Sequence, residues 1–299
     1  MNVFHNNNCL DEVLRCGRLY KGFSDAEPLV RAVCSTINQY FTENPLTPLP
    51  VIDLEKSTEQ IRAGQPIGLN PALVTKDVIE LLKRMSKSIL GANPQLREIV
   101  ESLHERFDRF LADFPAEVKK EEIYDLRNSL IKETVLEQDL ATFLFSLMLS
   151  SLYRQYLQSS AEVLRTDLWE GGDCPLCGEK PHFGMLRPED GAKQLECWLC
   201  GTRWVHTRIK CPFCNNEEQE SLGYFTIEGN DICRVNFCKS CRQYYKIFDA
   251  RKFQTDGDLV LTVHNLATLD YDLKAKEEGF TPGSCLEWVN EKEIANRQD

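Results

Sequence analysis

Four stretches of sequence decide the fold of this protein: CPLC at 174–177, CWLC at 197–200, CPFC at 211–214 and CKSC at 238–241. Two residues separate the cysteines of each pair, so a tight turn can direct both thiolates at one metal ion, and two such turns complete a tetrahedron. The pattern predicts two metal sites of four cysteines each. The eight candidate ligands are Cys174, Cys177, Cys197, Cys200, Cys211, Cys214, Cys238 and Cys241.

The spacing between the pairs predicts how they combine. Cys177 and Cys197 are separated by 19 residues, and Cys214 and Cys238 by 23, so each gap has room for a β-hairpin. Sequential pairing, first with second and third with fourth, needs only these hairpins. A cross-braced arrangement would thread alternate pairs together and is the less favoured alternative. The cysteine-rich half therefore reads as two ribbon units in tandem.

The ligand set leaves the identity of the metal open. Four thiolates suit zinc, and they also suit the single iron of a rubredoxin. A site with four protein ligands has no open position for water or substrate, which disfavours metal-dependent hydrolysis. The chain also lacks a Gly-x-Gly-x-x-Gly motif, a Walker loop and a His-Glu-x-x-His motif, so we expect no enzyme.

The remaining cysteines and histidines are weaker candidates. His182 and His206 lie within the ribbons and are alternative ligands, although eight cysteines already complete two sites. Thirteen cysteines that fall largely into Cys-x-x-Cys pairs indicate metal binding rather than disulfides. The cysteines outside these pairs read as ordinary thiols: Cys9, Cys16, Cys34, Cys233 and Cys285.

The half of the chain before the cysteines is predicted to be helical. Leu29, Val33, Ile37 and Tyr40 recur at spacings of three and four residues, as on one buried helix face. Composition changes near Trp169, which predicts an α+β protein with a helical domain at 1–168 and a ribbon domain at 169–299. The expected helices cover about 57–63, 72–90, 94–113, 118–131 and 137–165, and the segment 44–71 is otherwise irregular because it contains five prolines.

Charge and hydropathy limit the kinds of partner and the cellular location that we expect. The formal net charge is -11, and residues 169–250 carry 10 Lys and Arg against 12 Asp and Glu, so nucleic-acid binding is disfavoured. The first residues show no basic stretch followed by an apolar one, and the apolar run 140–153 is shorter than the ~20 residues of a membrane span. We expect a cytoplasmic protein without membrane insertion.

The ordered motifs CPLCG, ECWLCGTRW, IKCPFC, CKSCRQYYKIFD and LATLDYDLKAKEEGF resemble the FdhE family of formate dehydrogenase accessory proteins, over about 174–280. The resemblance implies a rubredoxin-like, metal-binding cytoplasmic protein that binds the catalytic subunit of a respiratory formate dehydrogenase before its export. The sequence departs from the family pattern at Asn215, where glycine is usual, and at His264 and Asn265, where acidic residues often stand. The first departure is expected to alter one turn.

Three functions follow in order of preference. The first is an accessory protein, or chaperone, whose two metal ions, iron or zinc, organise a surface for the formate dehydrogenase catalytic subunit. The second is a redox carrier in which iron passes an electron to that client. The third is a zinc-ribbon protein that binds nucleic acid, which the acidic charge makes the weakest.

Overall fold

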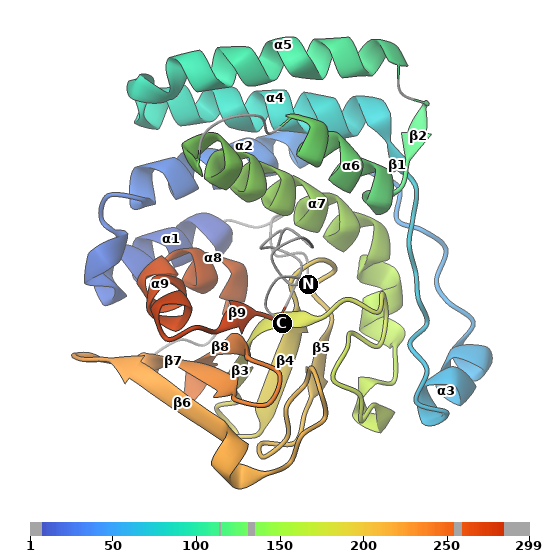
Figure 1. Cartoon of the computed structure of the whole chain (residues 1–299). Coiled ribbons are helices and arrows are strands. Elements are labelled where there is room, and N and C mark those ends of the chain that lie inside the picture. Colours follow the sequence, from blue (N-terminus) through green and yellow to red (C-terminus); the bar gives the residue numbers. More distant parts are fainter. Residues whose placement is uncertain (1–7, 114, 131–134, 254–258, 284–299) are drawn as a thin grey trace, which may run out of the picture.

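The computed structural model describes residues 8–113, 115–130, 135–253 and 259–283. Helices from the N-terminal half form layers on one side of the molecule, and a twisted sheet lies on the other (Figure 1). The predicted α+β class is confirmed. No helix in these ranges combines the length and the apolar character that a membrane crossing requires.

The helices follow the local signals of the sequence. Asp53 caps one of them by accepting hydrogen bonds from the backbone of Glu55 and Lys56, directly after the proline-rich stretch. Asn93 caps the next turn in the same way, with Pro94 at its first position. The α-helices are α1 (Asn8–Leu19), α2 (Glu27–Glu43), α3 (Leu54–Arg62), α4 (Thr75–Ala92), α5 (Arg97–Asp113), α6 (Lys120–Leu130), α7 (Val135–Val163), α8 (Leu261–Leu266) and α9 (Leu269–Glu277).

Helix α7 connects the helices of the N-terminal half to the sheet (Figure 1). Its apolar residues face in all directions, and residues such as Leu144, Met148 and Tyr153 are buried. A helix of this kind needs neighbours on several sides. It contacts α4 and α6 within the helical layer and passes down toward the sheet (Figure 1).

The two ribbons form one sheet rather than two separate units. In the first ribbon, β3 pairs with β4, and in the second, β7 pairs with β6 on one side and with β8 on the other, all antiparallel. Strands β3 and β8 then join the two ribbons by parallel pairing of Phe183–Leu186 with Lys246–Asp249. The strand order is β5-β4-β3-β8-β7-β6, with β9 beside β8. The strands are β3 (Pro181–Leu186), β4 (Lys193–Cys197), β5 (Arg203–Val205), β6 (Leu222–Ile227), β7 (Asn230–Cys238), β8 (Gln243–Asp249) and β9 (Thr281–Pro282), and β1 (Leu73–Val74) pairs separately with β2 (Glu117–Val118).

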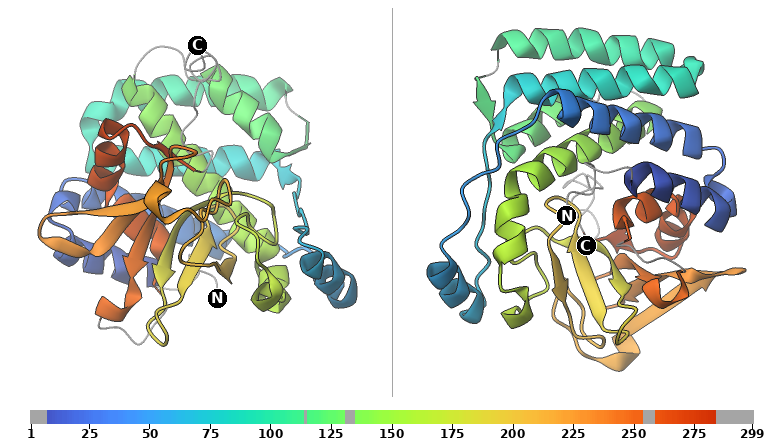
Figure 2. Two further views of the ribbon diagram at one scale, coloured as in Figure 1. Left: turned by 60° about the horizontal axis from the view of Figure 1, so that its bottom comes forward. Right: turned by 180° about the vertical axis from the view of Figure 1, so that it is seen from behind.

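Sheet and helices share one apolar core. It runs from Val13 in α1 through α7 to Ile247 in β8. Helix α8 lies beside α1, so the C-terminal part of the described chain returns to the N-terminal helix, as the right view of Figure 2 shows. All strands of the large sheet follow the predicted boundary near Trp169, but helices α8 and α9 follow it too. The division into a domain at 1–168 and one at 169–299 stays a prediction.

Candidate metal centres

The structure gathers the eight cysteines into two groups in the sequential order favoured by the sequence. Within each group the four Sγ atoms lie within 4.8 Å of one another. Cluster 1 consists of Cys174, Cys177, Cys197 and Cys200, and cluster 2 consists of Cys211, Cys214, Cys238 and Cys241.

The separations between sulfurs fit a tetrahedral metal ion. In cluster 1 the Sγ atom of Cys177 lies 3.5 Å from those of Cys197 and Cys200. In cluster 2 the Cys214 and Cys238 Sγ atoms are 3.7 Å apart. A metal–sulfur distance of about 2.3 Å places tetrahedral ligands about 3.8 Å apart. A disulfide would need sulfurs at about 2.05 Å, so these are thiol groups poised around a centre.

Each pair of cysteines sits on the same kind of turn. The Gly178 amide donates to the Cys174 carbonyl, and the equivalent bond links Gly201 to Cys197 and Asn215 to Cys211. The residue after each second cysteine has a positive φ: 79° at Gly178, 75° at Gly201, 60° at Asn215 and 60° at Arg242. Asn215 therefore adopts the glycine-like conformation, and the expected change of this turn is not found.

Cluster 1 lies inside the molecule, between the sheet and the helices. All four of its cysteines are buried. On one side, Ile67 and Leu69 donate backbone hydrogen bonds of 2.8 and 3.0 Å to the carbonyls of Pro175 and Leu176. The extended segment after α3 thus holds the first turn of the cluster.

Helix α7 holds the second turn of cluster 1. The Ser150 hydroxyl donates to the Trp198 carbonyl at 2.8 Å. Arg154 reaches the Glu196 carboxylate at 2.8 Å, and the same guanidinium group lies 3.4 Å from the Cys197 carbonyl. Glu196 also accepts from Arg203 at 2.7 Å, so a buried charged network connects the helical layer to this cluster.

Cluster 2 lies nearer to solvent. Cys211 and Cys238 are buried, but Cys214 is exposed and Cys241 is partly exposed. A hydrogen bond from Cys241 lowers the pKa of Cys211 to about 5, and the same bond raises the pKa of Cys241. A metal ion that binds the group would displace the thiol protons, because thiolate is the form that ligates.

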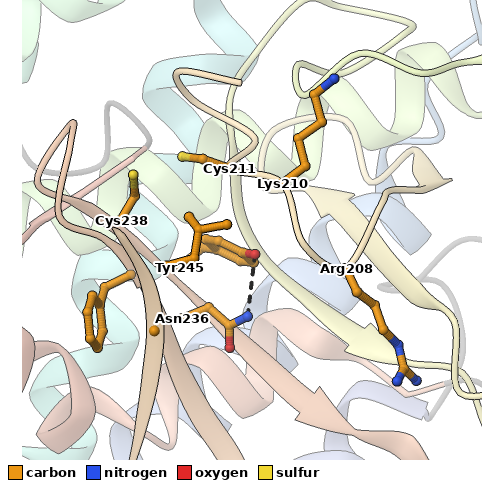
Figure 3. Close-up of a pocket in the computed structure, with 9 residues that line it drawn as sticks. Arg208, Lys210, Cys211, Asn236, Cys238 and Tyr245 are labelled. Carbon is orange, nitrogen blue, oxygen red and sulfur yellow. Dashed lines mark hydrogen bonds between the residues drawn. The ribbon is translucent and has the colours of Figure 1, made fainter. Parts of the chain in front are cut away.

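A small pocket lies beside cluster 2, with Cys211 and Cys238 at one end (Figure 3). Arg208, Lys210 and the Tyr245 hydroxyl line it, and Asn236 donates to that hydroxyl at 3.4 Å. Its volume is about 30 Å³. Organic ligands generally occupy pockets of about 300–1,000 Å³, so this pocket admits little more than water.

The other candidates lie apart from both clusters. His182 and His206 are buried, and burial lowers the pKa of each to about 4, but neither joins a cysteine group. Cys233 is a buried residue of β7 outside both clusters, and Cys285 lies outside the described residues. The structure also forms a third group that the sequence did not indicate: Glu12, Cys16 and His264.

Comparison with known proteins agrees with this division into two centres. Residues 173–208 match the family model "FdhE, central domain", and residues 209–286 match "FdhE, C-terminal domain". Residues 173–286 are therefore similar to the two FdhE domains in sequence. The predicted resemblance is confirmed, and the border between the two FdhE domains falls between the two cysteine clusters.

Individual relatives extend the similarity. "Protein FdhE homolog" from Aquifex aeolicus is 33% identical over 190 residues, which is 62% of this chain and 61% of that protein. The "Protein FdhE homolog" from Pseudomonas aeruginosa is 34% identical over 116 residues, only 36% of each chain. The crystal structure of the FdhE protein from Pseudomonas aeruginosa has the same fold, with a TM-score of 0.59 at 22% identity over 95% of this chain and 94% of that one.

Proposed function

We propose that the eight cysteines of clusters 1 and 2 hold two metal ions, and that the protein is an accessory factor for a respiratory formate dehydrogenase. It binds the catalytic subunit of that enzyme in the cytoplasm and acts on its maturation. The formate dehydrogenase partner comes from the resemblance of the cysteine motifs and the 266–280 stretch to FdhE proteins, and the FdhE domains at 173–286 support it.

The observation that carries a non-enzymatic role is the closed ligand set of both centres. Each cluster supplies four sulfurs at tetrahedral spacing, so a bound ion has no free position for a substrate. The ion contributes folding free energy instead, because it gathers thiolates from two turns that are separated by a stretch of strands. An ion in cluster 1 fixes the turns that α7 and the 67–69 segment contact.

A second function, electron transfer, is favoured by one observation. Cys214 in cluster 2 is exposed and Cys241 is partly exposed, so an iron ion bound there would lie close to the surface. Electron transfer between proteins requires such proximity, whereas cluster 1 is enclosed. Visible absorption of ferric thiolate in protein purified from anaerobic cells would support this function, and a colourless zinc protein would exclude it.

A deletion strain tests the accessory role. We expect loss of respiratory formate dehydrogenase activity while the catalytic subunit is still synthesised, because the factor acts after translation. Activity should return with the wild-type gene. Full activity in the deletion strain would contradict the proposal.

A pulldown tests the partner. The catalytic subunit should co-purify with tagged wild-type protein, and less with Cys214→Ser/Cys241→Ser if the surface near cluster 2 contacts the client. Nucleic acid should not co-purify at physiological salt, because a net charge of -11 offers little counterion release. Salt-sensitive recovery of DNA or RNA without the subunit would favour the nucleic-acid alternative.

A further inference from the structure

A third group of potential metal ligands lies where the N-terminal helix α1 meets α8. Glu12 and Cys16 come from successive turns of α1, and His264 comes from α8, 252 residues after Glu12. One ligand atom from each of the three lies within 4.8 Å of the others. The exposed fraction is 3% for Glu12 and 0% for Cys16 and His264.

The two nitrogens of the His264 ring have different neighbours. Nε2 lies 2.6 Å from the Glu12 carboxylate, so this nitrogen carries the proton and donates. Nδ1 then presents a lone pair. Two protonated groups point at it, the Tyr20 hydroxyl at 2.8 Å and the Cys16 thiol at 3.5 Å.

This arrangement gives one lone pair two competing donors in a buried place. A single in-plane lone pair accepts one good hydrogen bond, so the Tyr20 bond and the Cys16 bond cannot both be strong. A cation between the three atoms removes the competition, because thiolate sulfur, imidazole nitrogen and phenol oxygen then all act as ligands.

We propose that Cys16 Sγ and His264 Nδ1 bind a third metal ion of the zinc class, with Tyr20 Oη exchanging its 2.8 Å hydrogen bond to Nδ1 for a third ligand position and Glu12 orienting the imidazole. Metal–sulfur and metal–nitrogen distances of about 2.3 and 2.0–2.1 Å give a separation of about 3.6 Å between tetrahedral ligands. The Sγ to Nδ1 distance is 3.5 Å.

The contact between Glu12 and Nε2 is the one expected beside a metal-bound histidine. Such a ring usually donates its other N–H to a carboxylate, which fixes its orientation and tautomer. Arg15 holds Glu12 in turn, at 3.3 Å. Binding releases the Cys16 thiol proton to solvent, because thiolate is the form that ligates.

Catalysis by Cys16 is the competing interpretation of a cysteine beside a histidine and a carboxylate. The cysteine and the histidine are both fully buried, so no substrate reaches the sulfur in this conformation. An ion, in contrast, can be enclosed as the chain folds. Its effect is to connect α1 to the C-terminal helices, independently of the two cysteine clusters and of the proposed client.

Metal analysis of the intact protein tests the proposal. Protein purified under reducing conditions, saturated with zinc and desalted should contain three zinc ions per chain. Cys16→Ser and His264→Gln should each contain two. Cys34→Ser is the matched control, since Cys34 is equally buried in the adjacent helix α2 but is not part of the group, and it should retain three.

Cobalt substitution gives a second readout in the wild-type protein, which needs no variant to fold. Three cobalt equivalents should saturate the thiolate-to-cobalt absorption. The spectrum of the third ion should differ from that of the first two, because its ligands include nitrogen and oxygen instead of four thiolates. Saturation of wild-type protein at two equivalents of zinc or cobalt would overturn the third site. Three equivalents in Cys16→Ser and His264→Gln would overturn the assignment of these ligands.

Discussion

Clusters 1 and 2 have the same four-cysteine composition and the same turns, but they differ in what surrounds them. Cluster 1 is packed between α7, the 67–69 segment and the sheet, whereas cluster 2 has an exposed Cys214 at the outer end of the β6–β7–β8 hairpins. Identical coordination chemistry can therefore serve two purposes. Under the proposed function, an ion bound in cluster 1 would stabilise the junction of the two layers, and an ion bound in cluster 2 would shape a surface.

The largest expected effect separates the clusters by their contribution to stability. Cys174→Ser/Cys177→Ser should lose one ion, unfold the ribbon around it and give the larger fall in unfolding temperature, because a structural thiolate site supplies on the order of 10 kcal/mol of apparent binding free energy. Cys214→Ser/Cys241→Ser should lose one ion but keep a cooperative transition at lower temperature. Metal content and thermal unfolding followed by circular dichroism measure both. Equal destabilisation by the two pairs would contradict the comparison.

The charged network beside cluster 1 gives a smaller effect. Glu196→Gln removes the carboxylate between Arg154 and Arg203, and Arg154 is left as an uncompensated buried charge. Breaking such a pair costs about 3 kcal/mol or more of unfolding free energy. The exposed pair of Arg165 and Asp167 provides the control, since Asp167→Asn should leave the denaturant midpoint unchanged. No loss in Glu196→Gln would show that α7 does not depend on this contact.

Metal release should also distinguish the clusters. With a chromogenic chelator under native conditions, one ion should leave at least about tenfold faster than the other, a difference of ~1.4 kcal/mol in the barrier. Exposure of Cys214 admits the chelator to cluster 2, while cluster 1 opens only when the layers separate. Cys214→Ser/Cys241→Ser should lack the fast phase. Retention of that phase in the variant would assign it to another site.

The sequence predicted the features that depend on local chemistry. The four turns follow from the Cys-x-x-Cys spacing, and the helix predicted at about 57–63 is observed as α3, which begins earlier, at Leu54, after its cap Asp53. The FdhE resemblance rested on the same local motifs. The predicted helix near 118–131 is observed as α6 from Lys120 to Leu130, and those at 72–90, 94–113 and 137–165 are observed as α4, α5 and α7 with boundaries that differ by at most three residues. Helices α8 and α9 were not predicted.

Features that depend on distant pairing could not be predicted from one sequence. The parallel pairing of β3 with β8 joins residues more than 60 positions apart, such as Phe183 and Lys246, and no turn motif marks it. The contact between Glu12 and His264 spans almost the whole chain. Cys16 read as an ordinary thiol for the same reason, because it has no cysteine at a spacing of three residues.

The smallest expected effect concerns the turn of cluster 2 at Asn215. This residue has a φ of 60°, a left-handed conformation that glycine adopts freely and that asparagine tolerates at a small cost. Gly178 and Gly201 occupy the equivalent positions in cluster 1. Asn215→Gly should therefore relieve strain and change the unfolding free energy by less than about 1 kcal/mol, with the greater flexibility of unfolded glycine opposing the gain.

The opposite change, Gly201→Ala, should lower the unfolding free energy, because the added methyl group would meet the Arg154 guanidinium and the backbone would keep an unfavourable φ. Denaturant titration of both variants measures the difference. A large loss in Asn215→Gly would mean that the asparagine side chain, rather than the backbone conformation, holds this turn.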